Sequence, residues 1–156
     1  IKSKHLDEYK LDVDYSNLKA NYWNKVNLNK HNYLKNNWIV LPKEISNINK
    51  TNLITNKLTG ALIDRHLYTL ETSEKLDPEY LVVLIKSSWL EKKLLDYDKR
   101  TINQKNIKNL EIPLPDIDRQ KEIVKKVKSL SKIEEIRKYK WKIEKFKNNL
   151  FKNNHK

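Results

Sequence analysis

The sequence predicts an α+β fold: a small mixed globular domain of short strands and a few helices, followed by one long C-terminal helix that forms a coiled coil. Three observations support this prediction. Short apolar runs in the first half of the chain are bounded by turn-forming residues, which is typical of strands. Apolar residues recur at helical spacing between Leu76 and Leu95, and a second, strongly basic helical pattern begins at Arg119.

The expected strands lie mainly in the first half of the chain. Leu11–Tyr15 alternates apolar and acidic residues, and Trp38–Leu41 is an apolar run that Pro42 closes. Asn47–Lys57 is mostly polar and predicts a loop with one strand. Ala61–Leu70 follows the only glycine of the chain, so we expect a turn at that glycine and then a strand.

The pattern at Leu76–Leu95 predicts a helix. Asp77 is its candidate N-cap, and Pro78 suits the first helical position because its missing N–H is not needed there. A polar loop, Tyr97–Asn106, then leads to an expected strand over Ile107–Ile112.

Two prolines mark the end of the globular domain. Pro113 and Pro115 exclude both a helix and a central strand, so the chain must turn. Asp116 and Asp118 are candidate N-caps for a helix from Arg119. We therefore expect a domain over residues 1–116 and a helix over residues 117–156.

The apolar positions of this last helix recur every three or four residues, close to the coiled-coil repeat of about 3.5. A helix of roughly 32 residues is about 48 Å long and cannot bury such a seam alone, so it needs a partner helix. The expected interface residues are Ile123, Val127, Leu130, Ile133, Ile136, Tyr139, Ile143, Phe146 and Leu150.

The net charge of +13 is unevenly distributed. Residues 1–118 hold 19 Lys and Arg against 16 Asp and Glu, a balance of +3, whereas residues 119–156 hold 14 against 4, a balance of +10. Such a basic surface favours polyanions, and for a soluble protein this usually means nucleic acid.

Composition also restricts the class of protein. The chain has no run of about 18 apolar residues and no signal-peptide pattern, so we expect a cytoplasmic protein without membrane contact. With no cysteine it has neither disulfides nor thiolate zinc sites. Since methionine is absent even at position 1, we interpret the chain as a piece of a larger protein, with a processed start as the alternative.

The candidates for catalysis are weak. Asp77-Pro78-Glu79-Tyr80 resembles the Asp-Pro-Pro-Tyr motif of adenine methyltransferases, but Glu79 stands where the motif has its second proline. Pro115-Asp116 with Glu91-x-Lys93 fits the pattern of a metal-dependent nuclease poorly, and helix caps explain Asp116 and Asp118 better. The four histidines are scattered, so we expect neither an enzyme nor a metal site.

DNA recognition requires different side chains. Lys and Arg bind phosphates, while Arg, Lys, Asn, Gln, Ser or Thr contact base edges. Two polar stretches and one short pair supply them, and solvated loops in the product of an AT-rich genome are the alternative explanation. The candidates are Lys43, Asn47, Asn49, Lys50, Asn52, Lys57, Arg65, His66, Lys99, Arg100, Thr101, Asn103 and Gln104.

Two linked motifs carry a family resemblance. A strand, IPLP at residues 112–115, an acidic spacer, a Gln and a helix resemble the end of the target-recognition domain in specificity (S) subunits of type I restriction-modification systems. Leu76–Leu94 resembles the family's preceding helix. The resemblance covers somewhat more than a third of the chain.

This resemblance implies a non-catalytic domain that grips one half of a bipartite site in double-stranded DNA. Paired spacer helices would hold two such domains apart, and the domain would dock onto DNA methyltransferase subunits and possibly a restriction subunit. S-adenosylmethionine would bind the partner methyltransferase, and no cofactor would bind this chain.

The sequence departs from the family pattern in three respects. The loop at Lys99–Gln104 has no glycine, the family's opening segment is not recognisable, and only one recognition domain is present. We therefore expect either a homodimer through Ile123–Leu150 or a second spacer helix from the parent chain. The alternative function is a basic coiled-coil assembly module that binds nucleic acid without sequence specificity.

Overall fold

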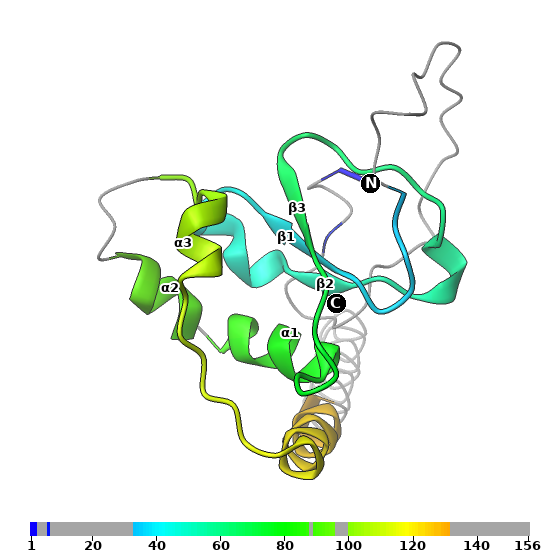
Figure 1. Cartoon of the computed structure of the whole chain (residues 1–156), viewed down its shortest axis with the longest axis vertical. Helices are drawn as coiled ribbons and strands as arrows, with labels where there is room; N and C mark the ends of the chain where they lie inside the picture. The colour runs from blue at the N-terminus through cyan, green and yellow to red at the C-terminus, as the bar shows by residue number, and fades with distance from the viewer. Residues whose placement is uncertain (3–5, 7–32, 88, 96–99, 132–156) are drawn as a thin grey trace, which may run out of the picture.

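The computed structural model describes residues 1–2, 6, 33–87, 89–95 and 100–131. In these residues a three-stranded antiparallel sheet has the order β2-β1-β3, with β1 at Ile39–Pro42, β2 at Asn52–Leu53 and β3 at Leu67–Leu70. Helices α1 (Pro78–Lys86), α2 (Trp89–Leu95) and α3 (Gln104–Lys108) lie to one side of the sheet, and the C-terminal helix lies beyond α1 (Figure 1). The predicted α+β class is confirmed.

Strand β1 is the centre of the hydrophobic core, and all four of its residues are buried. Because side chains alternate between the two faces of a strand, β1 contributes to clusters on both sides of the sheet, and Ile39 packs with Leu53 and Val82. Leu41 packs with residues of the helices and with Ile102, whereas Val40 packs with Leu34, Ile54 and other residues on the opposite side. The strand predicted at Trp38–Leu41 is thus confirmed, one residue further along the chain.

The other two strands also lie where strands were expected. Between β1 and β2 the chain forms a 3₁₀ helix, η3 at Ile45–Lys50, and a second one, η4 at Asn56–Leu58, follows β2. Gly60 has a φ of +84°, which confirms the predicted turn, and β3 occupies the last four residues of the predicted Ala61–Leu70 segment.

The predicted helix over Leu76–Leu95 forms as two helices, α1 at Pro78–Lys86 and α2 at Trp89–Leu95. The Asp77 side chain accepts a hydrogen bond from Tyr80 N at 2.9 Å, so the predicted N-cap is confirmed. At the other end, the Ser87 hydroxyl donates to Leu84 O at 2.7 Å. This local hydrogen bond satisfies a terminal carbonyl, with Ser87 as the C-cap of a helix that ends at Lys86.

The strand predicted at Ile107–Ile112 is wrong. A short helix, α3 at Gln104–Lys108, includes its first two residues, and residues 109–112 are irregular. The helix forms because the Asn103 side chain accepts from Asn106 N at 2.8 Å and caps it. Ile107 and Leu110, the apolar residues that suggested a strand, pack against the cluster of Leu41 and the helices.

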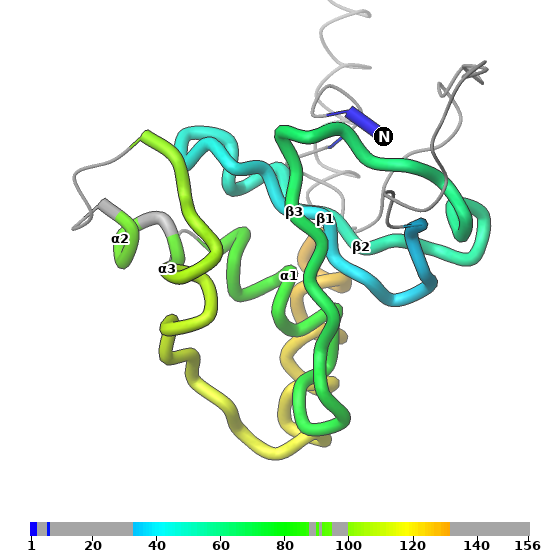
Figure 2. The backbone as a smooth tube through the Cα atoms, turned by 45° about the horizontal axis from the view of Figure 1, so that its top comes forward, coloured from blue at the N-terminus to red at the C-terminus, as the bar shows by residue number. Residues whose placement is uncertain are grey.

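The C-terminal helix begins at Ile117 and is described to residue 131 (Figure 2). Asp116 is its N-cap, since its carboxylate accepts from Arg119 N at 2.9 Å. Asp118, the other candidate, lies within the first turn. The strand predicted at Leu11–Tyr15 and the seam positions from Ile133 onward lie outside the described residues. Nowhere in the described segments is a helix long and apolar enough to cross a membrane.

Candidate nucleic-acid interface

Three segments that are distant in sequence meet beside the end of β1. Lys43 N donates to His66 O at 3.1 Å, and Ile102 N donates to Lys43 O at 2.7 Å. Glu44 and Thr101 form an isolated antiparallel bridge, and Ile45 N donates to Arg100 O. Residues 43–45 therefore lie between the turn at residues 64–66 and the segment at residues 100–102, which brings five of the predicted DNA-binding residues together. These five, which we call the cationic cluster, are Lys43, Arg65, His66, Arg100 and Thr101.

Lys43 is the central residue of the cationic cluster. Its ammonium donates a hydrogen bond to Arg65 O and lies 4.5 Å from the centroid of the Tyr68 ring. The Tyr68 hydroxyl in turn donates to Ile102 O at 3.3 Å. The side chain of Lys43 is half-buried and its charge interacts within the protein, so Lys43 holds the neighbouring segments together.

The turn beside it presents Arg65 and His66 to solvent. Asp64 accepts a hydrogen bond from His66 N at 2.9 Å, and this bond lowers the pKa of the Asp64 carboxyl. Arg65 Nε donates to His66 Nε2 at 3.3 Å. These hydrogen bonds within the turn therefore order the two exposed, nitrogen-rich side chains of Arg65 and His66 next to each other.

Helix α3 adds amide and ammonium groups to the same side of the molecule. Gln104 and Lys105 are exposed in its first turn, and Lys108 is exposed at its end. Asn103 is also exposed, but its side-chain oxygen is used as the helix cap. The cap therefore occupies the side-chain oxygen of Asn103, whereas the side-chain oxygen of Gln104 remains available to a base edge.

The remaining candidates do not join this surface as a group. Asn52 is fully buried in β2, and we leave it out of the proposed interface. Asn47 donates to the Glu44 carboxylate at 2.7 Å, and Asn49 O accepts from Lys86 Nζ at 2.9 Å. Lys50 is half-buried, and Lys57 is exposed in η4, at the far end of the sheet from α3 (Figures 1 and 2). Lys99 lies outside the described residues.

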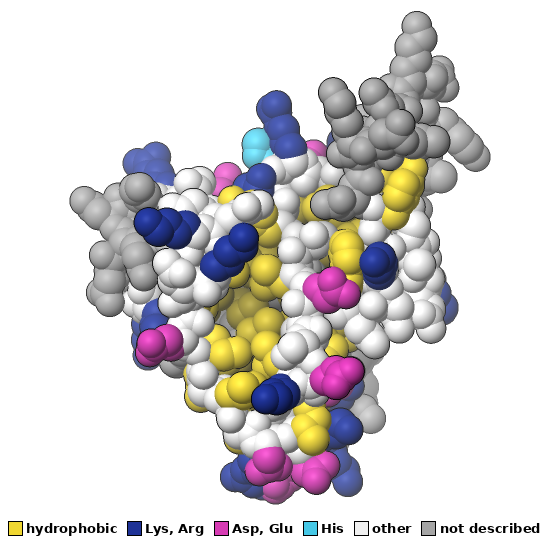
Figure 3. Space-filling model, in the orientation of Figure 1, with side chains coloured by type: hydrophobic (Ala, Val, Ile, Leu, Met, Phe, Trp, Pro, Cys, Tyr) yellow, Lys and Arg dark blue, Asp and Glu magenta, His cyan; other side chains and the backbone are white. Residues whose placement is uncertain are grey.

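Below the cationic cluster the surface is apolar. A cavity of about 210 Å³ opens between β3, α1, α2 and the segment around α3, and its walls include Leu41, Leu70, Leu81, Ile107 and Ile112. Figure 3 shows this hollow of hydrophobic side chains with Lys and Arg side chains gathered above it.

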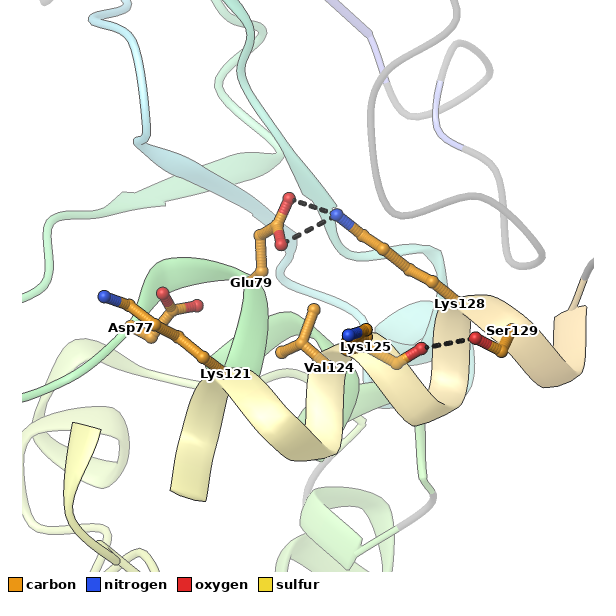
Figure 4. Close-up of a pocket in the computed structure, with 7 residues that line it drawn as sticks. All are labelled: Asp77, Glu79, Lys121, Val124, Lys125, Lys128 and Ser129. Atoms are coloured by element: carbon orange, nitrogen blue, oxygen red, sulfur yellow. Dashed lines mark hydrogen bonds and ion pairs between the residues drawn. The ribbon is translucent and has the colours of Figure 1, made fainter. Parts of the chain in front are cut away.

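The C-terminal helix forms a second basic surface where it meets α1. Figure 4 shows Lys121, Lys125 and Lys128 along a groove of about 440 Å³ that Asp77 and Glu79 border from the α1 side. Lys128 Nζ lies 2.7 Å and 2.8 Å from the two carboxylate oxygens of Glu79. The ion pair links the exposed side of the helix to α1, and Lys121 and Lys125 are exposed beside it.

Of the predicted interface positions, the structure describes Ile123, Val127 and Leu130. The first two are half-buried, and Leu130 keeps 62% of its surface exposed. Val124, which is not one of the predicted positions, is buried at 4% exposure. The helix therefore uses one face for its own domain and leaves a neighbouring apolar face at Leu130 uncovered.

Within the described ranges, no group of three or more His, Cys, Asp or Glu side chains could hold a metal ion. An α+β domain that exposes arginine, lysine and amide groups at one end and continues into a basic helix has the features of a nucleic-acid-recognition module.

Comparison with known proteins identifies the family. The chain belongs to the type I restriction modification DNA specificity domains, whose family model matches residues 2–145. The resemblance stated from the sequence motifs is confirmed, and the family is one of non-catalytic specificity components. No curated protein matches the chain.

Two solved structures have the same fold. One comes from work on complex assembly and conformational transition of the type I restriction-modification system, with a TM-score of 0.72 and 16% identity. The other is the HsdS subunit from Thermoanaerobacter tengcongensis, with a TM-score of 0.70 and 16% identity. Each match covers 96% of this chain and 40% of the solved one, so the chain spans less than half the length of these relatives.

One buried, hydrogen-bonded polar residue is missing from the site residues predicted from the sequence. Gln120 is fully buried at the start of the C-terminal helix. It hydrogen-bonds both to Asp77 of the domain and to Pro115 of the segment before the helix, residues 113–116, which we call the connector. The only sequence signal for it was its place in the family motif, because burial of a single Gln beside exposed Arg119 and Lys121 has no periodic pattern.

Proposed function

We propose that this chain is a target-recognition domain that reads one half of a bipartite site in double-stranded DNA, over residues 1–116, joined to a spacer helix over residues 117–156. The observation that carries the proposal is the cationic cluster beside α3, in a chain of the DNA specificity domain family. Exposed cations beside an exposed amide are what groove recognition needs.

The side chains divide into two roles. Arg65 and Arg100 are exposed and contact phosphates or guanine edges, while Gln104 reads a base through its amide. His66, which accepts a hydrogen bond from Arg65, and Thr101, the residue after Arg100, add further polar groups to this contact. Lys43 positions the two segments that carry the arginines.

The proposal extends to the partners. The chain directs DNA methyltransferase subunits, and a restriction subunit where the system has one, to the target in the cytoplasm. The methyltransferase supplies S-adenosylmethionine and performs the reaction. A second recognition domain, from another copy or from the parent chain, pairs with this one through the spacer helix.

Methylation mapping in cells tests this function. Cells with the parent protein should carry methylated bases in one bipartite sequence, and cells without it should lose methylation at that sequence alone. A variant with Arg65→Ala and Arg100→Ala should lose it too, while Lys57→Ala, at the far end of the sheet, should keep it. Methylation that is independent of the parent protein contradicts the proposal.

A second candidate is a basic assembly module that binds nucleic acid without sequence specificity. The charge of +10 on residues 119–156 and the exposure of Leu130 favour it. It predicts equal binding to all duplexes, with a salt dependence that comes from the helix rather than from Arg65 and Arg100.

A further inference from the structure

Gln120 joins the C-terminal helix to the globular domain. It is fully buried, although Arg119 and Lys121 on either side are exposed. Its amide oxygen accepts from Asp77 N at 2.8 Å, and its amide nitrogen donates to Lys75 O at 2.9 Å and to Pro115 O at 2.8 Å. One side chain thus binds the loop before α1 and the connector before its own helix.

The chemistry of these partners requires an amide. One partner is a donor and two are acceptors, so the side chain must offer one acceptor and two donors in a fixed order. A carboxylate would place an acceptor against two carbonyl oxygens, and an apolar side chain of similar volume would leave buried polar groups unsatisfied. The three bonds come from separate backbone positions, so together they restrict both tilt and rotation of the helix.

Further along the helix, the contacts with the domain lie on the same helix face as Gln120. Gln120, Val124 and Lys128 are four residues apart and share one face. Val124 is buried, and Lys128 pairs with Glu79, as Figure 4 shows. The ion pair is partly exposed and contributes little on its own, so the buried Gln120 bonds are the main restraint.

A small change in helix angle has a large effect at its end. From Gln120 to residue 131 the helix rises roughly 17 Å, so a tilt of about 10° moves residue 131 by about 3 Å. That displacement is close to the rise of about 3.4 Å per base pair of DNA.

We propose that Gln120 is a positioning residue that fixes the angle between the recognition domain and the spacer helix, and thereby the number of base pairs between this half-site and the next. This inference rests on the proposed function of the chain. It assigns base reading to the cationic cluster and α3, and spacing to Gln120.

A DNA selection separates the two roles. The full-length parent with its methyltransferase is offered duplexes in which both half-sites and the distance between them are randomised. Gln120→Met should keep the selected bases, but its preference for one spacing over the neighbouring ones should fall by roughly tenfold, the factor for one net hydrogen bond. Gln104→Met, the matched control on the only other glutamine, should relax the bases and keep the spacing.

A distance measurement tests the angle without DNA. The chain has no cysteine, so spin labels can be attached at Lys92→Cys on α2 and Ser131→Cys on the C-terminal helix, both exposed positions. Gln120→Met should broaden the distance distribution in the folded protein, and Gln104→Met should leave it unchanged. A loss of stability alone would lower the melting temperature without broadening this distribution.

The outcomes distinguish the two proposals. If wild type selects no motif, the proposed function fails, while the label distances still decide whether Gln120 sets the angle. If Gln120→Met folds with wild-type distances and spacing, the inference is overturned. If Gln120→Met does not fold, the same measurements are made on Gln120→Asn, which keeps the amide but is too short to reach all three partners. Failure of both variants to fold would mean that Gln120 is required for the fold, which also overturns a positioning role.

Discussion

The Lys43 ammonium lies 4.5 Å from the centroid of the Tyr68 ring, with Arg65 O as its hydrogen-bond acceptor. This relationship places a cation of the proposed DNA-binding surface in a structural role. Tyr68 also binds Ile102 O, so the pair connects β3 with the turn at residues 64–66 and the segment at residues 100–102.

Substitution of Lys43 should therefore affect stability first. We expect Lys43→Met to lower the free energy of unfolding by about 1–2 kcal/mol, since it removes a charged hydrogen bond and a cation–π contact. Arg65→Met should leave stability nearly unchanged, but lower the slope of log K against log salt by about one. Urea unfolding and salt titration of DNA binding measure the two effects. A lowered slope with unchanged stability for Lys43→Met would show that Lys43 contacts a phosphate instead.

Asn103 should act as a helix cap. Asn103→Ala should cost about 0.5–2 kcal/mol of unfolding free energy, because α3 loses the acceptor for Asn106 N. Asn103→Ser keeps a capping oxygen and should retain both stability and base preference. Loss of base preference in a stable Asn103→Ser variant would assign Asn103 a direct contact with DNA.

Tyr80 should hold the proline connector to α1. Its hydroxyl donates to Pro113 O at 3.0 Å, and only 5% of the residue is exposed. Tyr80→Phe should cost about 1 kcal/mol in urea unfolding and leave the selected bases unchanged. A change in the selected bases would mean that the connector contributes to reading.

Leu130 should mediate contact with a partner helix. Leu130→Ser should weaken self-association about tenfold or more, because a buried leucine contributes about 1.5–3 kcal/mol. Leu114→Ser is the control, since Leu114 is also exposed, at 51%, but lies in the connector before the helix. Light scattering across micromolar concentrations measures both, and equal effects of the two variants would remove Leu130 from the interface.

Helix content should depend on Glu122 in acid. Lys126 and Arg119 lower the pKa of Glu122 from 4.5 to about 2. A lowered pKa means that this contribution to stability is complete above pH 4.5 and is lost as pH falls toward about 2. Circular dichroism should show a loss of helix signal in this window, smaller in high salt and smaller still in Glu122→Gln. An unchanged acid profile in Glu122→Gln would contradict the ion-pair assignment.

Local sequence signals predicted where α1 and the C-terminal helix begin. Asp77 followed by Pro78 is sufficient to define the start of α1, because the capping carboxylate and the backbone N–H that donates to it are three residues apart. Asp116 and Asp118 were both possible caps, and the hydrogen bond that Arg119 N donates to the Asp116 carboxylate decides between them. The Asn103 cap was missed because apolar residues at Ile107, Leu110 and Ile112 also fit a strand.

The candidate interface was predictable only in its parts. Side-chain chemistry marked Arg65, His66, Arg100 and Thr101, but their meeting depends on backbone bonds to residues 43–45 that no local pattern indicates. The same chemistry marked Asn52, whose burial follows from the place of β2 beside β1. Gln120 depends on three backbone partners, two of them more than 40 residues away, and its role emerges only from the fold.

The central claim is that the cationic cluster and α3 read a DNA sequence. Selection from random duplexes by the parent protein with its methyltransferase tests it most directly. We expect one short half-site to be enriched, to become degenerate at one position in Gln104→Ala, and to weaken uniformly in Arg65→Ala. If no motif is enriched, or if Gln104→Ala, Arg65→Ala and Arg100→Ala all keep the wild-type motif and affinity, this surface does not read DNA.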